Sequence, residues 1–283
     1  MIKSDCSEGR VMKIAYTSDI HLDFWVNPKE NDAKQHKLLR RFIDDVLKPP
    51  DADVLVIAGD IGHYNRQNLL LIEKLRERYK YIVLTWGNHD LYLVSKRQEK
   101  EYGTSQQRLE AFKQGCKEIE GVFFLDGDTV EIEGVRFWGS GLWYFVENVA
   151  HWRATMTDAM RIVTPHTTHI DFDGYGKRVR YRFDPHVLYE QEMQKLKTAP
   201  KADVVVTHVA PTLPFDIEKP ADSYYRFDGK EHILRINPKL WIFGHDHRSY
   251  DFTVGTTRLV SCPLGYPGEK INKVHTIKTF NIA

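Results

Sequence analysis

Residues 81–90 read YIVLTWGNHD, a short apolar run followed by a turn that carries Asn88 and His89. Four other stretches repeat this unit, in which a run rich in β-branched or aromatic residues ends in Gly, His, Asp or Asn. These four apolar runs are Lys13–Thr17, Val54–Ala58, Val204–Val206 and Leu240–Phe243. Continuous apolar runs of this kind suit strands that are covered on both faces of a sheet. The sequence therefore predicts five buried strands, each ending in a polar turn.

Segments with helical spacing separate these runs. Apolar residues recur every three or four positions in four stretches, Lys34–Leu47, Gln67–Arg78, Gln106–Ile119 and His186–Leu196. Strand followed by helix, repeated along the chain, is typical of an α/β architecture. Shorter strands are expected just after Gly121 and in the C-terminal quarter, at 249–254, 257–261 and 275–281. Two packed sheets flanked by helices fit this pattern better than one doubly wound sheet.

Residues 147–185 follow neither pattern. The stretch is polar and aromatic, and a segment this long without clear elements is often functional or disordered. Either a surface excursion or a substrate-facing lid fits, and in a lid Arg153, Arg161 and Arg178 could bind phosphate oxygens. We expect residues 1–11 to be a flexible N-terminal extension. Residues 12–283 would form a single domain, with residues 147–185 as its insert.

Composition narrows the class of partner. The chain has 283 residues and a net charge of +1, so no overall basic field favours nucleic acid or an anionic membrane. Its three cysteines are widely spaced, which argues against a disulfide framework or a thiolate zinc site. The N-terminus is polar, and no stretch approaches the roughly 20 apolar residues of a membrane span. A cytoplasmic protein without a membrane partner is expected.

Potential metal ligands follow each predicted strand within three residues. They are Asp19 and His21, Asp60, Asn88 with His89, His208, and His245 with His247. In open α/β sheets, ligands bind beyond the carboxyl ends of the strands, so one shared site is expected. Nitrogen and oxygen donors without thiolate suit Mn, Fe, Zn, Co or Ni better than Ca or Mg alone. The set is too large for one tetrahedral ion but sufficient for two ions that share a carboxylate.

The ordered motifs D-x-H, GD, GNHD, TH and GHDH resemble the calcineurin-like metallophosphoesterase superfamily over nearly the whole chain. The segments GSGLW (139–143) and CPLGYPGE (262–269) are similar to a small bacterial and phage-type branch of it. This resemblance implies an α/β (α+β) fold, a four-layer αββα sandwich with two mixed sheets flanked by helices. It also implies a binuclear phosphatase or phosphodiesterase, in which a hydroxide between two metal ions attacks phosphorus in line.

The resemblance further implies roles for single residues. One metal would take Asp19, His21, Asp60 and His247, and the other would take Asp60, Asn88, His208 and His245. Manganese is the first expectation for both ions, with Fe, Zn, Ni or Co as alternatives. His89 would stabilise charge on the phosphate and act as general acid, and Asp90 would orient His89 through a hydrogen bond.

This hypothesis expects a small phosphorylated substrate such as a nucleotide. Two alternatives stay open beside it. The first is a nuclease of the same superfamily, supported only by the basic run KRVRYR at 177–182, which is also typical of a solvated strand face. The second is a non-catalytic scaffold, whose usual mark would be lost ligands, and none is lost here. Asp23, His63 and Asp246 lie close to ligands in the sequence and are expected to be outer or solvated residues.

Overall fold

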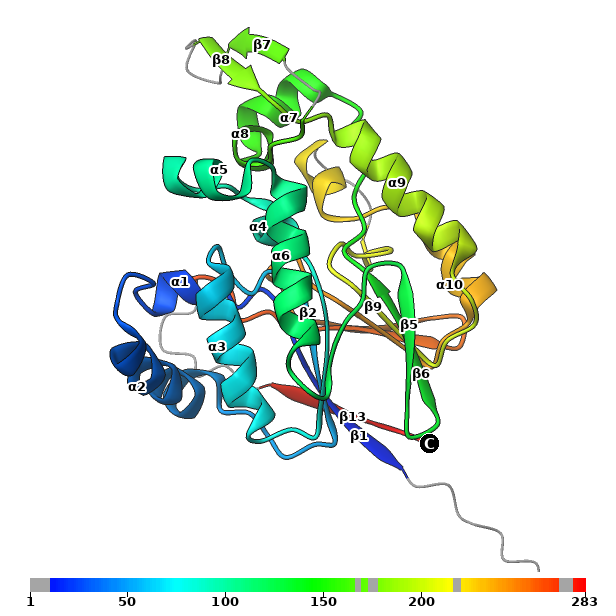
Figure 1. Ribbon diagram of the computed structural model, residues 1–283. Helices are drawn as coiled ribbons and strands as arrows, with labels where there is room; N and C mark the ends of the chain where they lie inside the picture. Colours follow the sequence, from blue (N-terminus) through cyan, green and yellow to red (C-terminus); the bar gives the residue numbers. More distant parts are fainter. Residues whose placement is uncertain (1–10, 166–168, 173–177, 216–219, 270–276) are drawn as a thin grey trace, which may run out of the picture.

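Two β-sheets lie face to face in the computed structural model, with helices on the outer face of each (Figure 1). The structure describes residues 11–165, 169–172, 178–215, 220–269 and 277–283. The first sheet has the strand order β13-β1-β2-β3-β4, in which β13 alone is antiparallel to its neighbour. Its strands are β1 (Met12–Thr17), β2 (Val54–Ala58), β3 (Tyr81–Thr85), β4 (Val122–Phe124) and β13 (Lys278–Ile282).

The second sheet has the order β11-β12-β10-β9-β6-β5. Its four central strands are parallel, and the two edge strands β11 and β5 are antiparallel to their neighbours. The strands are β5 (Asp128–Ile132), β6 (Val135–Ser140), β9 (Val204–Thr207), β10 (Leu240–Phe243), β11 (Tyr250–Val254) and β12 (Thr257–Ser261). Both sheets are therefore mixed, and the predicted two-sheet fold is confirmed.

Alternation along the central strands explains why their sequences are apolar throughout. Successive side chains of a strand point to opposite faces of its sheet. In β2, Val54 and Val56 pack in the core between the two sheets, whereas Leu55 and Ile57 pack in the core beneath the helices. In β10, Ile242 likewise packs between the two sheets and Trp241 packs beneath the helices. Each central strand is thus buried on both faces.

Helices cover the outer faces of the sheets (Figure 1). On the first sheet lie α2 (Asp32–Phe42) continued by the π-helix η1 (Ile43–Leu47), α3 (Asn65–Arg76) and α6 (Ser105–Lys117), whereas the short helices α1 (Leu22–Trp25), α4 (Asn88–Leu91) and α5 (Lys96–Tyr102) belong to the loops after its strands. On the second lie α9 (Pro185–Thr198) and α10 (Lys230–Ile236), and η2 (Pro220–Tyr225) belongs to the loop between β9 and β10. Asn31, Thr104 and Asp184 cap α2, α6 and α9 by accepting backbone N–H groups. The four predicted helices are present, with ends shifted by one or two residues.

The described residues of the stretch 147–185, called the insert below, form regular elements. The insert contains α7 (Val149–Thr155), α8 (Asp158–Arg161) and a hairpin of β7 (His169–Phe172) and β8 (Arg178–Tyr181), which lies far from the two sheets in Figure 1. Trp152, Tyr181 and Phe183 are buried in the helix-side core. Residues 1–10 lie outside the described part of the chain, so the expected N-terminal extension stays a prediction. Within the described residues, no helix is long and apolar enough to cross a membrane.

A buried arginine ties two loops of the first sheet together. Arg108 of α6 is fully buried, and its guanidinium donates to backbone carbonyls of the loops after β2 and β3. Nη1 lies 3.0 Å from the carbonyl oxygen of His89 and 3.1 Å from that of Tyr92, and Nη2 lies 2.8 Å from that of Gly62. The carbonyl of His89 also accepts the backbone N–H of Tyr92, and that of Gly62 accepts Nδ2 of Asn68, so the guanidinium adds to the hydrogen bonds that hold these turns.

We expect Arg108→Ala to lower the free energy of unfolding by about 1–3 kcal/mol or more, since a buried acceptor left without its hydrogen bond costs this much. Urea unfolding followed by circular dichroism measures this. Arg258→Ala is the matched control, because Arg258 pairs with Asp251 at the surface and both side chains are more than two-fifths exposed. That exposed pair should contribute less than about 1 kcal/mol. Similar losses in the two variants would show that the carbonyl contacts of Arg108 do not stabilise the loops.

Candidate metal centre and active site

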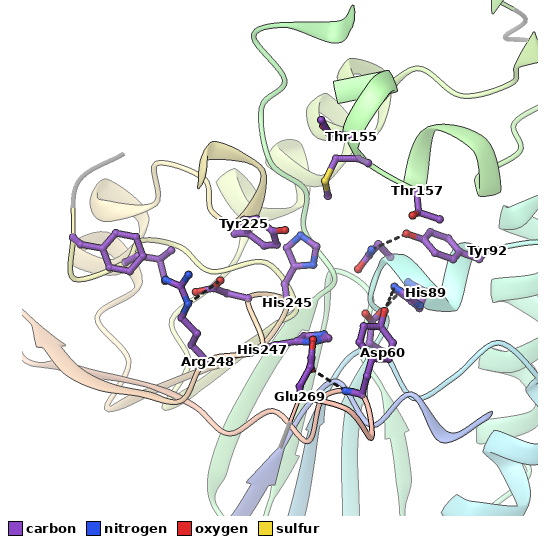
Figure 2. A pocket seen from close by; sticks show the side chains of 16 residues that line it. Asp60, His89, Tyr92, Thr155, Thr157, Tyr225, His245, His247, Arg248 and Glu269 are labelled. Carbon is purple, nitrogen blue, oxygen red and sulfur yellow. Dashed lines mark hydrogen bonds and ion pairs between the residues drawn. The ribbon is translucent and has the colours of Figure 1, made fainter. Parts of the chain in front are cut away.

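The predicted ligands meet at one rim of the two sheets. Asp19 and His21 follow β1, Asp60 follows β2 and Asn88 follows β3, all in the first sheet, whereas His208 follows β9 and His245 and His247 follow β10 in the second. These strands are parallel within each sheet, so their carboxyl ends lie on the same side. An open pocket of about 530 Å³ lies there, and Figure 2 shows Asp60, His89, His245 and His247 converging in it.

Five of the predicted ligands hold the backbone in the left-handed region. The φ angles are 50° at Asp19, 46° at His21, 56° at Asp60, 74° at His245 and 53° at His247. Non-glycine residues adopt this conformation at a cost, and such residues cluster at functional sites. Their side chains are thereby turned into the rim instead of continuing the strands.

Two glycines allow these turns to approach one another closely. A Cβ atom at Gly87 would lie 2.2 Å from Oδ1 of Asp60, and one at Gly244 would lie 2.6 Å from Oδ2 of Asp19. Both positions therefore exclude any larger residue. This explains the glycine that precedes Asn88 and the one that precedes His245 in the sequence.

Asp60 is the centre of the cluster and is almost fully buried. Its Oδ2 lies 3.4 Å from Nε2 of His208 and 3.8 Å from Nε2 of His21, and its Oδ1 accepts the backbone N–H of His89 at 2.8 Å. Burial alone would raise the pKa of Asp60, but the neighbouring His208 and His89 hold it well below its usual value. Burial alone would lower the pKa of His208, but the Asp60 carboxylate raises it to about 10. The centre is thus built around one ionised carboxylate.

Three of the histidines have one ring nitrogen fixed by an acceptor outside the cluster. Nδ1 of His208 donates to the carbonyl of Ala58 at 2.9 Å, and Nε2 of His245 donates to that of Tyr224 at 2.9 Å. Nδ1 of His247 lies 2.8 Å from the carboxylate of Glu269. In a neutral imidazole the other ring nitrogen then carries the lone pair. Outer hydrogen bonds of this kind are typical of histidines that bind metals.

The fourth histidine, His21, lies close to His247, and its Nδ1 has no hydrogen-bond partner among the described residues. Nε2 of His21 lies 2.9 Å from Nε2 of His247, and Nε2 of His247 lies 3.6 Å from Oδ1 of Asp19. Burial lowers the pKa of His21 to about 3, so its ring is neutral. Since Glu269 occupies Nδ1 of His247, its Nε2 lone pair faces the other ring. A cation among Asp19, His21 and His247 would satisfy all three, and the donor atoms of these residues lie within 4.8 Å of one another.

Asn88 is oriented by a residue of the insert. Its Nδ2 donates to Oδ1 of Asp158 at 2.9 Å and to the hydroxyl of Tyr92 at 3.1 Å, which leaves Oδ1 at 3.0 Å from Nε2 of His208. Asp158 is fully buried and also accepts the hydroxyls of Tyr92 and Tyr144. An amide can bind a metal only through its oxygen, so Asp158 selects the competent orientation. Nothing in the sequence points to Asp158, because it lies in the stretch without a pattern.

The prediction that Asp90 orients His89 is wrong. Oδ2 of Asp90 accepts the backbone N–H groups of Asp60 and Gly87, each at 2.8 Å, and Oδ1 has no partner among the described residues. The tight turn leaves these amides without a ladder partner, and the carboxylate satisfies them. Nδ1 of His89 instead lies 2.9 Å from Nε2 of His63, which is buried and takes the outer position, one of the two that the sequence left open for it.

The insert lines the pocket, but not with the predicted arginines. Its contribution is the turn between α7 and α8, residues 155–157, and Figure 2 shows Thr155 and Thr157 above the histidines. Arg153 lies over the ring of Tyr181 at 5.1 Å, and neither Arg153 nor Arg161 is among the described lining residues. The side chain of Arg178 lies outside the described part. The lining arginine is Arg248, which sequence reasoning missed although it directly follows the GHDH motif.

Two known proteins are similar to this chain in sequence. An uncharacterized protein of Acanthamoeba polyphaga mimivirus is 24% identical over 276 residues, which cover 92% of this chain and 93% of that protein. A UPF0046 protein of Caenorhabditis elegans is 23% identical over 240 residues, and the match covers 77% of this chain but only 52% of that relative.

A crystal structure of the phosphopantetheinyl hydrolase from Mycobacterium tuberculosis aligns with a TM-score of 0.62 at 16% identity, covering 92% of both chains. At this identity the likeness supports the two-sheet fold alone. The model of the calcineurin-like phosphoesterase family matches residues 12–249, which is most of the sequence. The predicted superfamily is confirmed, and the chain belongs to the calcineurin-like phosphoesterase family.

Proposed function

We propose that this phosphoesterase is a binuclear, metal-dependent phosphoester hydrolase. The observation that carries the proposal is the position of the Asp60 carboxylate between His21 and His208, within two overlapping groups of possible ligands. One ion would be held by Asp19, His21, Asp60 and His247, and the other by Asp60, Asn88, His208 and His245. Two divalent ions, with manganese as first candidate and Fe, Zn, Ni or Co as alternatives, would activate water and neutralise phosphate charge.

His89 is the residue that would act on the leaving group. It lines the pocket next to Asp60, and its backbone N–H fixes it to that carboxylate. Burial holds the pKa of its ring well below the usual value. A bound phosphate ester brings negative charge close to the ring, which favours its protonated form. In that form Nε2 can donate its proton to the ester oxygen that leaves phosphorus.

The pocket suits a small phosphoester with an organic group. Beyond the histidines its wall includes Leu213, Phe215, Tyr225 and Arg248, and the guanidinium of Arg248 lies 5.9 Å from the ring centre of Phe215. Aromatic faces stack on bases and other planar groups, and a guanidinium can bind a second anionic group. A nucleotide-sized substrate fits these features, and the net charge of +1 gives no support to a nuclease.

A substrate panel on metal-reconstituted protein tests the activity, with Asp60→Ala as the inactive comparison. It should include p-nitrophenyl phosphate, bis-p-nitrophenyl phosphate, nucleoside monophosphates, cyclic nucleotides, a phosphopantetheinyl ester and single-stranded DNA. We expect wild-type protein to hydrolyse at least one small ester. Asp60→Ala should lose turnover and hold fewer than two metals by elemental analysis, because one carboxylate serves both ions.

Asp128→Asn is the control, since this carboxylate is 60% exposed at the start of β5 and should leave metal content and turnover unchanged. Two metals bound to Asp60→Ala would refute the shared carboxylate. Absence of hydrolysis across the panel with all five metals would refute the proposed activity. Rapid cleavage of DNA alone, with an affinity that falls steeply with salt, would favour the nuclease.

A variant of Asp158 tests separately whether the insert supports metal binding through Asn88. We expect Asp158→Ala to weaken metal binding by about 10–100-fold, the usual effect of removing an outer hydrogen bond from a ligand, because the Asn88 amide loses its fixed orientation. Competition with a metal chelator measures the affinity, with Asp128→Asn again as the control. Unchanged affinity in Asp158→Ala would mean that the amide is oriented by other contacts.

A further inference from the structure

A series of hydrogen bonds runs from Nδ1 of His89 through the ring of His63 to the carboxylate of Asp23. Nδ1 of His89 lies 2.9 Å from Nε2 of His63, and Nδ1 of His63 lies 2.8 Å from Oδ2 of Asp23. The other oxygen of Asp23 accepts the backbone N–H of His63 at 3.0 Å. The side chains of His63 and Asp23 are 8% and 10% exposed, so these hydrogen bonds are shielded from solvent. Asp23 lies two residues after His21, and His63 lies three after Asp60.

The carboxylate of Asp23 decides which nitrogen donates in each of these hydrogen bonds. An ionised carboxylate only accepts, so Nδ1 of His63 donates to Asp23 and a neutral His63 presents Nε2 as an acceptor. Nδ1 of His89 must then donate to His63. The remaining nitrogen, Nε2 of His89, faces the pocket side, where it lies 3.2 Å from the hydroxyl of Tyr266. These hydrogen bonds therefore fix both the tautomer of His89 and the direction in which its Nε2 points.

Packing holds the two rings in this relation. The rings of His63 and His89 are stacked with centroids 4.9 Å apart, and Tyr92 stacks on His63 at 5.6 Å. Gln98 donates to the carbonyl of His63 at 2.7 Å. A histidine that only fills the core would satisfy its ring on backbone or solvent. Here both ring nitrogens of His63 are used on side chains, one of which lines the pocket.

We propose that His63 and Asp23 are positioning residues for His89, an inference that rests on the proposed function. Together they hold Nε2 of His89 toward the leaving oxygen and place a negative charge behind the ring when it is protonated. In that step the proton of Nε2 passes to the ester oxygen as the bond from this oxygen to phosphorus breaks, and the electron pair of the bond stays on the oxygen. Nδ1 keeps its proton and its hydrogen bond to His63. An aspartate behind a catalytic histidine acts in this way in hydrolytic triads.

The first test is kinetic and uses manganese-reconstituted protein with a series of aryl phosphates. We expect His63→Ala and Asp23→Asn to keep two metals and nearly unchanged KM. Turnover of phenyl phosphate should fall by about 10–100-fold, less than the roughly 10²–10⁴-fold loss of His89→Ala. The loss should shrink for 2,4-dinitrophenyl phosphate, whose leaving group needs little protonation. His232→Ala, on α10, is the control and should behave as wild type.

A double variant separates a positioning role from a structural one. If His63 acts through His89, adding His63→Ala to His89→Ala should cost no further turnover, since residues that act as one unit are not additive. His63→Gln, which can still accept a hydrogen bond from Nδ1 of His89, should recover part of the loss. Additive losses, equal losses across the leaving groups or loss of metals in His63→Ala would each overturn the proposal.

The second test does not depend on activity. Ring ¹⁵N NMR of histidine-labelled, metal-free protein should show His89 protonated at Nδ1 in the wild type and a mixture of tautomers in His63→Ala. An unchanged tautomer in the variant would overturn the proposal. If wild-type protein hydrolyses none of the panel with any metal, the proposed function fails by itself, and the NMR result still shows whether His63 and Asp23 hold the ring.

Discussion

The rest of the site depends on one ionised carboxylate that two sheets enclose. Asp60 is buried where β2 ends, and it faces His21 from the first sheet and His208 from the second. A buried anion is costly unless cationic or hydrogen-bonding groups surround it. The imidazoles, the His89 backbone N–H and the metals that we propose supply this compensation. The requirement brings the two sheets to a common rim and explains why the turns are tight enough to need Gly87 and Gly244.

Much of this could be predicted from the sequence, because the signals are local. Apolar runs specify the buried strands, helical spacing specifies α2, α3, α6 and α9, and the polar residues just after each run specify the proposed ligands. The residues that were missed or misassigned have partners far along the chain. Asp158 meets Asn88 across 70 residues, His63 meets Asp23 across 40, and Arg108 reaches the carbonyl of Gly62 across 46. No periodicity records such pairs, since they exist only once the strands are assembled.

The error over Asp90 comes from the resemblance, which implies that this carboxylate serves the adjacent His89. The turn directs the two side chains differently. Asp90 points back to the backbone amides of Asp60 and Gly87, whereas His89 points toward the pocket and toward His63. Neighbours on a short helical turn do not face each other. In such a turn, the hydrogen-bond partner of a side chain is usually three or more positions away or in another loop.

The two walls of the pocket come from different parts of the chain, and this division has a consequence. The first sheet and its loops, up to Arg108, supply His89, its proposed positioning residues and four of the seven proposed ligands. The rest of the lining includes residues 155–157 of the insert, Leu213 and Phe215, and Tyr225 and Arg248, and Figure 2 shows the last two on the side away from His89. These residues contact the volume beyond the ligands, where the organic part of an ester would lie. Changes there can alter substrate preference without moving Asp60 or His89. Asp158 connects the insert to the proposed metal centre through its hydrogen bond to Asn88.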